Sequence, residues 1–201
     1  MKTRVIYVKK LALVATFSAL GVAISPFLWF PFLGSKAYPT QHMINAILGV
    51  LLGPCWTALA AIIIGTIRIM FGVGTPYAFP GGIPGGIVVG IIYWFLGRIK
   101  INEKKRLTSA LTEPVGTLLI GVPLALFLLT PLIVSQDAFA PWIDNTKYPT
   151  SLTSENPAFL AFLIYGAGWA LSCIPGSIIG FFILLILNKA GMNRENLFGE
   201  K

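Results

Sequence analysis

The stretch 72–86 reads GVGTPYAFPGGIPGG and lies directly between two strongly apolar segments. Glycine and proline at this density predict a break in helical structure, because glycine is entropically costly in a helix and proline lacks the amide donor. Irregular backbone near membrane depth persists only where protein buries it or where it lines a cavity. We therefore predict a small-molecule pocket at this stretch. A plain outer turn that joins two helices is the alternative.

The composition of the whole chain is that of a membrane protein. Hydrophobic residues make up 56% of the 201 positions and charged residues 11%, whereas a soluble domain carries roughly 25% charged residues. The formal net charge of +8 would suit a nucleic-acid-binding protein, but the basic residues cluster at the ends of apolar runs, as in cytoplasmic segments. The three clusters are Lys2, Arg4, Lys9 and Lys10; Arg98, Lys100, Lys104, Lys105 and Arg106; and Lys189, Arg194 and Lys201.

The apolar runs predict the number of membrane crossings. A crossing needs roughly 20 residues, so six helices fit, although the second is short; the runs fall at 8–28, 42–53, 55–71, 83–97, 110–134 and 159–188. Gly53 and Pro54 either end one helix and begin the next or kink a single longer helix. Six crossings place all three basic clusters on the cytoplasmic side, and five do not. We therefore expect an all-α membrane protein with six transmembrane helices and both termini cytoplasmic.

This topology predicts one integral membrane domain over 1–201, multi-pass in a cell membrane of the bacterial cytoplasmic type. Its outer side would carry a loop or lid at 29–41, the glycine- and proline-rich loop at 72–86 and a polar loop at 135–158, and its cytoplasmic side the basic loop at 98–107. Trp29, Phe30 and Phe32 are either an interfacial aromatic belt or a lid over the pocket.

Polar and aromatic side chains near the expected outer side are the candidate substrate-binding residues. Hydrogen bonds would come from Gln41, His42, Asn45 and Thr75, and aromatic stacking from Tyr77, Phe79, Tyr165 and Trp169. Gln41 and Asn45 are one helical turn apart, and Tyr165 and Trp169 share a face with Ser172 and Gly176. Polar contacts between helices and simple aromatic packing are the alternatives.

Two charged residues stand inside apolar runs. Apart from Lys9 and Lys10 at the start of the first run, Arg68 is the only basic residue within a predicted span, and a buried cation in a membrane bundle suggests a functional site. We expect its guanidinium to hold carbonyl groups of the 72–86 stretch, with direct ligand contact as the alternative. Glu113 is expected near the cytoplasmic surface, where it would favour a helix N-terminus or take part in a cytoplasmic contact. An ion pair between Arg68 and Glu113 is not expected.

The first apolar run contains Ala15, Ala19 and Ala23, a small residue at every fourth position. This spacing creates a stripe where another helix can approach closely. Packing against lipid or against another helix of the same chain is the alternative.

The motifs of enzymes are missing from the sequence. There is no GxxxxGK[ST] phosphate loop, no HExxH and no GxSxG, and the chain has one His. We therefore expect no enzyme, no catalytic residue, no metal site and no cofactor. Cys55 and Cys173 are expected to be reduced and inert. A binding subunit that depends on another protein for energy fits these absences.

Three stretches of the sequence resemble a known family: PTQHMINAILGVLLGP at 39–54, RIMFGVGTPYAFPGGIPGG at 68–86 and EPVGTLLIG at 113–121. They are similar to the ThiW family, the substrate-binding S components of energy-coupling factor (ECF) vitamin transporters. The similarity covers most of the chain and is strongest over 36–90. S components look like six-helix bundles with both termini inside, whose first helix carries an AxxxA motif that docks on the coupling subunit. That motif matches Ala15 and Ala19.

The resemblance implies a function in vitamin uptake. The substrate would be hydroxyethylthiazole, the thiazole precursor of thiamin, captured from outside. The partners would be a transmembrane coupling subunit and two ATPase subunits, and ATP hydrolysis by these partners would reorient the protein in the bilayer. An S component for thiamin or another vitamin, and a stand-alone secondary transporter, are the alternatives.

Overall fold

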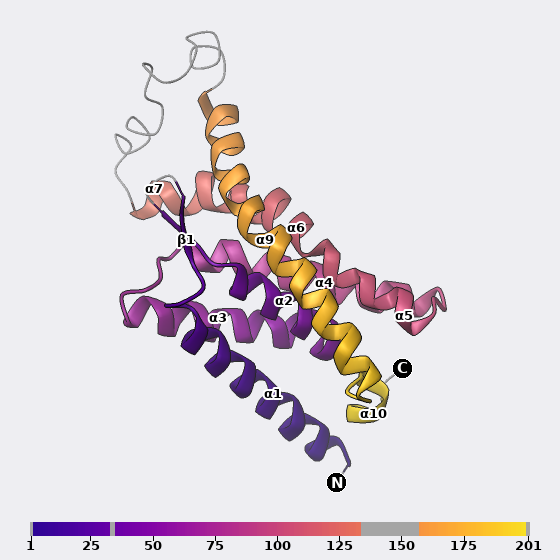
Figure 1. Cartoon of the computed structure of the whole chain (residues 1–201). Helices are drawn as coiled ribbons and strands as arrows, with labels where there is room; N and C mark the ends of the chain where they lie inside the picture. The colour runs from indigo at the N-terminus through magenta and orange to yellow at the C-terminus, as the bar shows by residue number, and fades with distance from the viewer. Residues whose placement is uncertain (1, 33–34, 134–156, 200–201) are drawn as a thin grey trace.

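The computed structural model describes residues 2–32, 35–133 and 157–199, which are mostly helical (Figure 1). A short antiparallel hairpin of β1 (Phe30–Phe32) and β2 (Ser35–Ala37) follows the first helix. The expected outer loop at 135–158 lies almost entirely outside the described residues. The main helices are α1 (Lys2–Ile24), α2 (Pro39–Leu52), α3 (Pro54–Met70), α4 (Ala78–Arg98), α9 (Pro157–Lys189) and the short α10 (Arg194–Phe198).

A long helical segment with a changing hydrogen-bond pattern follows α4. Pro114, Pro123 and Pro131 each remove an amide donor from it, and two stretches form wider π turns, which recur near functional sites. Its parts are α5 (Glu103–Arg106), the 3₁₀ turn η1 (Leu107–Thr112), α6 (Glu113–Gly116), the π turns η2 (Thr117–Gly121) and η3 (Leu124–Leu129), and α7 (Thr130–Ile133).

The glycine- and proline-rich stretch is largely helical, so the prediction of irregular backbone over 72–86 is wrong from Ala78 onward. Pro80 lies in the first turn of α4, where a missing amide donor costs little. The glycines of α4 serve close packing instead: a Cβ atom on Gly85 would lie 2.2 Å from Oε1 of Glu113. Small residues allow this approach between membrane helices. Within 72–86, only residues 72–77, which link α3 to α4, are non-helical.

A glycine turn separates α2 from α3, which decides between a kinked helix and two helices. Gly53 has a φ of 87° and Pro54 is the first residue of α3. A positive φ is easy for glycine and unfavourable for other residues. Gly90 of α4 packs on this turn, since a Cβ atom there would lie 2.5 Å from the backbone nitrogen of Pro54.

Neighbouring helices run in opposite directions along the chain. The start of α3 meets the later part of α4 at Gly90, whereas Gly65, near the end of α3, meets Phe79 at the start of α4. Gly82 of α4 meets Gln41, close to the start of α2, so α2 and α4 are parallel. The alternation brings the ends of the described chain together.

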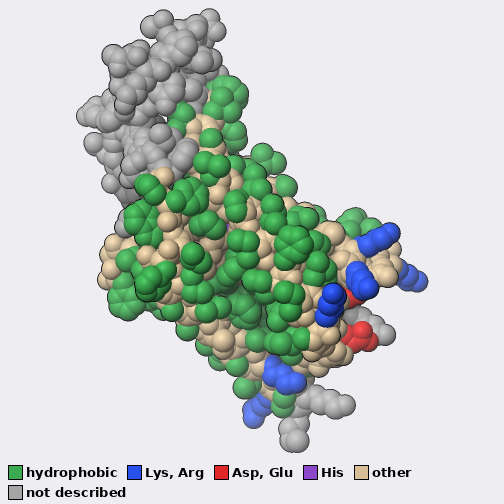
Figure 2. Space-filling model, in the orientation of Figure 1, with side chains coloured by type: hydrophobic (Ala, Val, Ile, Leu, Met, Phe, Trp, Pro, Cys, Tyr) green, Lys and Arg blue, Asp and Glu red, His purple; other side chains and the backbone are tan. Residues whose placement is uncertain are grey.

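Both ends of the chain lie at the same end of the bundle, beside α5, and the β1–β2 hairpin and α7 lie at the opposite end (Figure 1). Lys9 Nζ donates a hydrogen bond to the Leu197 carbonyl at 3.0 Å, and Lys10 Nζ lies 5.1 Å from the centre of the Phe198 ring. Figure 2 shows that Lys and Arg side chains gather at this end, while hydrophobic side chains cover most of the remaining described face.

Four helical stretches are long and apolar enough to cross a membrane: Thr3–Ile24, Ala78–Arg98, Glu103–Leu129 and Phe162–Lys189. The chain is therefore an all-α, multi-pass membrane protein. The helices α2 and α3 have only 14 and 17 residues, below the roughly 20 needed for a full crossing. Four candidate spans are thus present among the described residues, and six membrane crossings remain a prediction.

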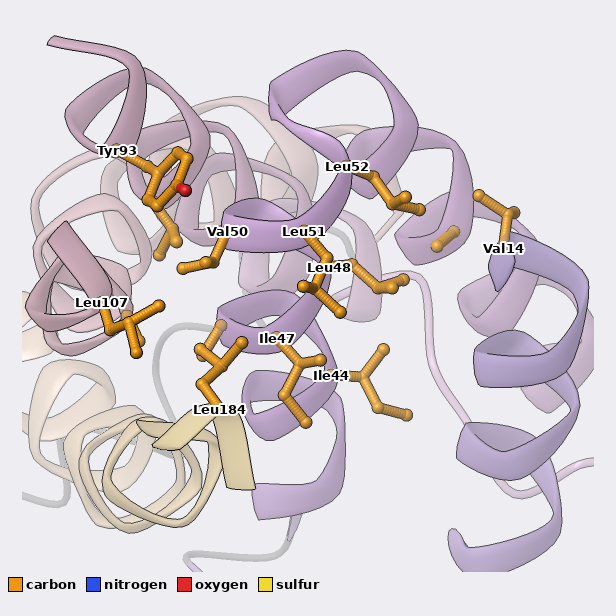
Figure 3. Close-up of a cluster of buried hydrophobic side chains, with 14 of the residues drawn as sticks. Val14, Ile44, Ile47, Leu48, Val50, Leu51, Leu52, Tyr93, Leu107 and Leu184 are labelled. Atoms are coloured by element: carbon orange, nitrogen blue, oxygen red, sulfur yellow. The ribbon is translucent and has the colours of Figure 1, made fainter. Parts of the chain in front are cut away.

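The short helix α2 is the centre of the core. Almost every residue of α2 is buried, because α1, α3, α4 and α9 all pack against it. Figure 3 shows Ile44, Ile47 and Leu48 of α2 pointing into a cluster with Val14 and Leu184. A helix enclosed in this way needs no lipid-facing side, and its polar residues can contact other helices or a ligand.

Candidate functional site

A small pocket opens at the end of the bundle that carries the β1–β2 hairpin. Its volume is about 70 Å³, room for several water-sized groups, since one enclosed water needs roughly 10–15 Å³. Residues from the hairpin, α2, α3, the α3–α4 link, α4 and α9 form its wall: Ala37, Tyr38, Gln41, His42, Arg68, Thr75, Tyr77, Ala78, Gly81, Trp169 and Ser172. Segments that are far apart in the sequence thus form one site.

Aromatic rings form two sides of the pocket. The indole of Trp169 lies against the backbone of α4, 3.6 Å from where a Cβ atom on Gly81 would be. The Tyr77 hydroxyl lies 2.9 Å from Oγ1 of Thr130, and the Tyr77 ring is 6.3 Å from that of Tyr165 at a tilted angle. Flat rings around a small cavity suit an aromatic ligand.

Arg68 stands in the pocket wall and contacts an aromatic ring rather than the expected carbonyl groups. It is 3% exposed, and its guanidinium carbon lies 3.6 Å from the centre of the Tyr38 ring. The Tyr38 hydroxyl donates a hydrogen bond to the Val73 carbonyl of the α3–α4 link. Tyr38 therefore holds the link directly, and Arg68 supports Tyr38 by a cation–π contact. Our prediction that Arg68 itself binds these carbonyls is wrong for the described residues.

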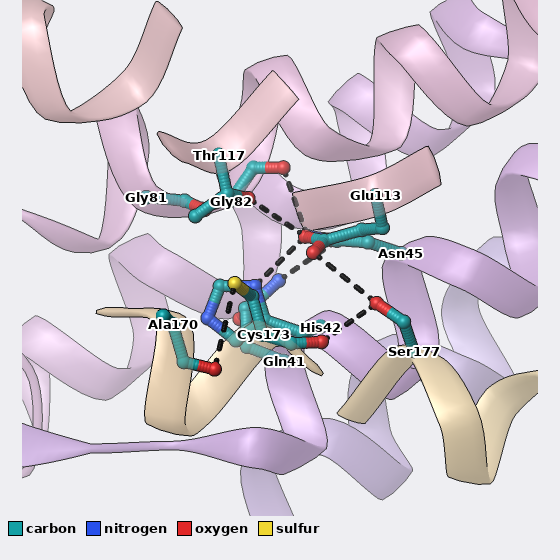
Figure 4. A network of polar contacts seen from close by, with 10 residues as sticks. All are labelled: Gln41, His42, Asn45, Gly81, Gly82, Glu113, Thr117, Ala170, Cys173 and Ser177. Carbon is teal, nitrogen blue, oxygen red and sulfur yellow. Dashed lines mark hydrogen bonds and ion pairs between the residues drawn. The ribbon is translucent and has the colours of Figure 1, made fainter. Parts of the chain in front are cut away.

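The floor of the pocket is a histidine on a buried carboxylate. Nδ1 of His42 lies 2.8 Å from Oε1 of Glu113, which is fully buried (Figure 4). Nε2 of His42 has no hydrogen-bond partner among the described residues. Since His42 lines the pocket, this second nitrogen is available to a ligand.

Further polar groups surround Glu113. Asn45 Nδ2 donates to Oε1 of Glu113 at 3.2 Å and to the Gly82 carbonyl at 2.8 Å. The Thr117 hydroxyl lies 2.9 Å from the same Oε1, and the Ser177 hydroxyl 3.5 Å from Oε2. Three other helical elements, α2, η2 and α9, thus supply hydrogen-bonding groups to one carboxyl group, as a buried polar group requires.

Glu113 does not lie near the surface, and our prediction of a cytoplasmic or helix-terminal role is wrong. The helical segment begins at Glu103, ten positions earlier, which carries Glu113 into the bundle. The sequence signal for this was weak, because the basic stretch 103–106 was assigned to a cytoplasmic loop. As expected, Arg68 and Glu113 form no ion pair in the described part of the chain; Oε1 of Glu113 instead lies 2.8 Å from Nδ1 of His42.

The eight predicted substrate-binding residues divide into two groups. Gln41, His42, Thr75, Tyr77 and Trp169 line the pocket. The other three lie behind its wall: Asn45 bonds to Glu113, Phe79 packs near Gly65 of α3, and Tyr165 packs with Val122 and Leu126.

Six lining residues were not among those predicted to bind substrate, and three of them, Tyr38, Arg68 and Ser172, have polar side chains. Tyr38 immediately precedes α2, and nothing in its sequence context marked it. Ser172 was noted on the face with Trp169, and this spacing could have identified it. Arg68 was singled out as a buried cation, with ligand contact only as the alternative. No group of three or more metal-binding side chains occurs within the described ranges.

The alanine stripe of α1 faces away from the bundle. Ala15, Ala19 and Ala23 are all exposed, whereas Val14 and Ser18 of the same helix are buried. Packing of this stripe against another helix of the described chain is therefore excluded, and it is free for a partner or for lipid.

Comparison with known proteins supports a transport function. The family whose sequence model matches residues 11–190 is described as thiamine-precursor transporter protein (ThiW). The chain belongs to the ThiW family. ThiW is a transporter family, so this chain is a membrane transport protein and not an enzyme. No curated protein and no solved structure matches the chain. A ThiW protein needs a site for a small precursor, and the pocket described above lies within the matched residues.

Proposed function

We propose that this ThiW protein is the substrate-capture (S) subunit of an ECF-type importer in the cell membrane and binds hydroxyethylthiazole from outside. The observation that carries this proposal is the pocket itself, which combines aromatic walls with a small polar floor. The pocket is small, as expected for a small, single-ring ligand. The end with the termini and basic clusters would be cytoplasmic, which turns the pocket outward.

Within this pocket the ligand ring would stack on Trp169 and Tyr77. Gln41, His42 and Thr75 would bind its hydroxyl group and ring nitrogen. Asn45, Phe79 and Tyr165 would act indirectly, because they support the wall from behind. A ligand analogue that leaves a buried polar group unpaired would lose roughly 1–3 kcal/mol of binding free energy for each such group.

Thiamin itself is a less suitable ligand. Thiamin carries a permanent positive charge on its thiazolium ring, and the described wall contains the cation Arg68 and no carboxylate. The one nearby carboxylate, Glu113, lies behind His42. Like charges in a site of low dielectric repel strongly, so a neutral thiazole fits better.

A coupling subunit and two ATPase subunits would supply energy, and their ATP hydrolysis would reorient the protein in the bilayer. The exposed stripe of Ala15, Ala19 and Ala23 supports docking of such a subunit, because small residues let two membrane helices approach closely.

Uptake by proteoliposomes tests this function against the stand-alone alternative. Radiolabelled hydroxyethylthiazole should accumulate only when the coupling subunit, both ATPases and internal ATP accompany the protein. Uptake by the protein alone under an ion gradient would instead identify a secondary transporter.

A further inference from the structure

The hydrogen-bond chain below the pocket determines which nitrogen of His42 carries a proton. Asn45 Nδ2 donates to Oε1 of Glu113, and the orientation of this amide is fixed because it also donates to the Gly82 carbonyl. The Asn45 oxygen in turn accepts from Gln41 Nε2 at 3.2 Å. Both oxygens of an ionised Glu113 can only accept, so Nδ1 of His42, 2.8 Å from Oε1, donates to it.

A neutral imidazole with its proton on Nδ1 presents Nε2 as a hydrogen-bond acceptor. The charged groups around this ring are Glu113 on one side and Arg68 in the same pocket wall. Besides His42, the carboxylate receives neutral donors from Asn45 and Thr117, so it does not need an imidazolium partner.

We propose that Glu113, acting through His42, makes the pocket floor a hydrogen-bond acceptor, so that the protein selects ligands carrying a hydroxyl donor. Glu113 is thus a positioning residue, because it lies outside the pocket lining and acts through its contact with His42. This inference rests on the proposed function and defines its substrate class as small heteroaromatic alcohols.

The chain has one His, which allows a direct test by nitrogen NMR. With ¹⁵N-histidine labelling and a purification tag free of histidine, every imidazole signal belongs to His42. We expect a protonated Nδ1 and an unprotonated Nε2, with Nε2 shifting when the alcohol binds. A proton on Nε2 in the ligand-free protein, from either the other tautomer or an imidazolium, would overturn the inference.

Calorimetric titration with three ligands tests the selectivity. Hydroxyethylthiazole is compared with its methyl ether and with the ethyl analogue that lacks oxygen; the smaller ethyl analogue controls for steric exclusion of the ether. Because both analogues leave the buried acceptor unpaired, we expect each to bind roughly tenfold or more weakly than the alcohol. Equal binding of alcohol and ether would refute the role of His42, while the function proposed above would stand. Failure of the alcohol to bind would refute that function instead.

Two variants isolate the contribution of Glu113. Glu113→Gln keeps the side-chain shape but can present either an amide donor or a carbonyl to Nδ1, so the tautomer is no longer fixed. We expect the preference for alcohol over ether to shrink severalfold in this variant. Glu103→Gln makes the same chemical change in α5, at the opposite end of the bundle, and should keep the preference of the wild type. An unchanged preference in folded Glu113→Gln protein would overturn the inference. If this variant does not fold, the NMR experiment on the wild type still decides.

Discussion

At the scale of single residues, the site depends on how two buried charges are compensated. Glu113 receives hydrogen bonds from several helices, whereas Arg68 lies on the ring of Tyr38. An uncompensated charge in a membrane bundle is costly, so both residues should matter for stability as well as for binding.

Replacement of Arg68 tests the cation–π contact. Arg68→Leu should lower the free energy of unfolding without ligand by about 1–2 kcal/mol, since a desolvated cation–π contact is worth roughly 2 kcal/mol. Arg68→Lys keeps the charge but not the planar stacking, and should fall between Leu and wild type. Thermal denaturation in detergent measures both. An unchanged melting temperature in Arg68→Leu would show that Arg68 has no structural role.

Gly85 should tolerate no side chain. A Cβ atom there would lie 2.2 Å from Oε1 of Glu113 and 2.6 Å from Oγ1 of Thr117, and forced repacking of this kind costs roughly 1–3 kcal/mol. Gly85→Ala should therefore lower the melting temperature and weaken ligand binding. Gly166→Ala in α9 is the matched control, because nothing lies within 4 Å of its added Cβ. Equal stability of the two variants would contradict the observed packing.

Single residues also show what the sequence could and could not predict. Gln41, His42 and Trp169 were selected from polar and aromatic spacing, and they do line one pocket. Glu113 was misplaced, because its depth depends on where its helix begins, and a basic amphipathic turn looked like a loop. Tyr38 was missed because its role comes from a contact with Val73, 35 positions away, which no local pattern reveals.

At the scale of elements, glycine and proline have different effects on helix formation in soluble proteins and in a membrane bundle. The first part of α4, up to Gly86, was predicted to be a loop, yet the backbone is helical from Ala78. In lipid the backbone must satisfy its hydrogen bonds internally, which favours the helix despite low propensity. Because the glycines of α4 have no side chains, α2 and the 103–133 segment pack closely against α4.

The turn between α2 and α3 gives a prediction at this scale. Gly53 has a φ of 87° and a ψ of −179°, a conformation essentially restricted to glycine that costs a residue with a Cβ atom roughly 1–3 kcal/mol. Gly53→Ala should therefore lower the free energy of unfolding by about that amount, and Gly53→Asn should cost as much, because this ψ lies outside the left-handed helical region that Asn visits. Thermal unfolding in detergent ranks the stabilities of the wild type, Gly53→Ala and Gly53→Asn. Equal stability of Ala and Gly at this position would contradict the turn geometry.

At the scale of the whole molecule, one end of the bundle carries the pocket and the other carries the basic residues (Figure 2). The membrane character followed from the hydrophobic runs, whereas the described residues contain four candidate spans and the six crossings stay a prediction. The short lengths of α2 and α3 could not be predicted, because a helix enclosed by other helices is apolar whether or not it spans the membrane. The outward direction of the alanine stripe also required the packed structure, since periodicity alone does not tell which face of α1 is free.

The alanine stripe predicts how the protein meets its partner. Ala19→Leu adds bulk on the exposed face of α1 and should abolish co-purification with the coupling subunit while leaving ligand affinity and melting temperature unchanged. Ala167→Leu, at an exposed position of α9, is the matched control and should co-purify normally. Normal co-purification of Ala19→Leu would rule out this docking surface.

The most direct test of the account is titration of the detergent-purified protein with hydroxyethylthiazole, thiamin and the pyrimidine precursor, followed by intrinsic fluorescence. Trp169 lines the pocket, so a bound ligand should change its fluorescence emission. Trp169→Phe should remove most of this ligand-induced change. We predict a saturable response to hydroxyethylthiazole alone. A response to thiamin or to the pyrimidine instead, or no response to any of the three in folded protein, would contradict the thiazole pocket.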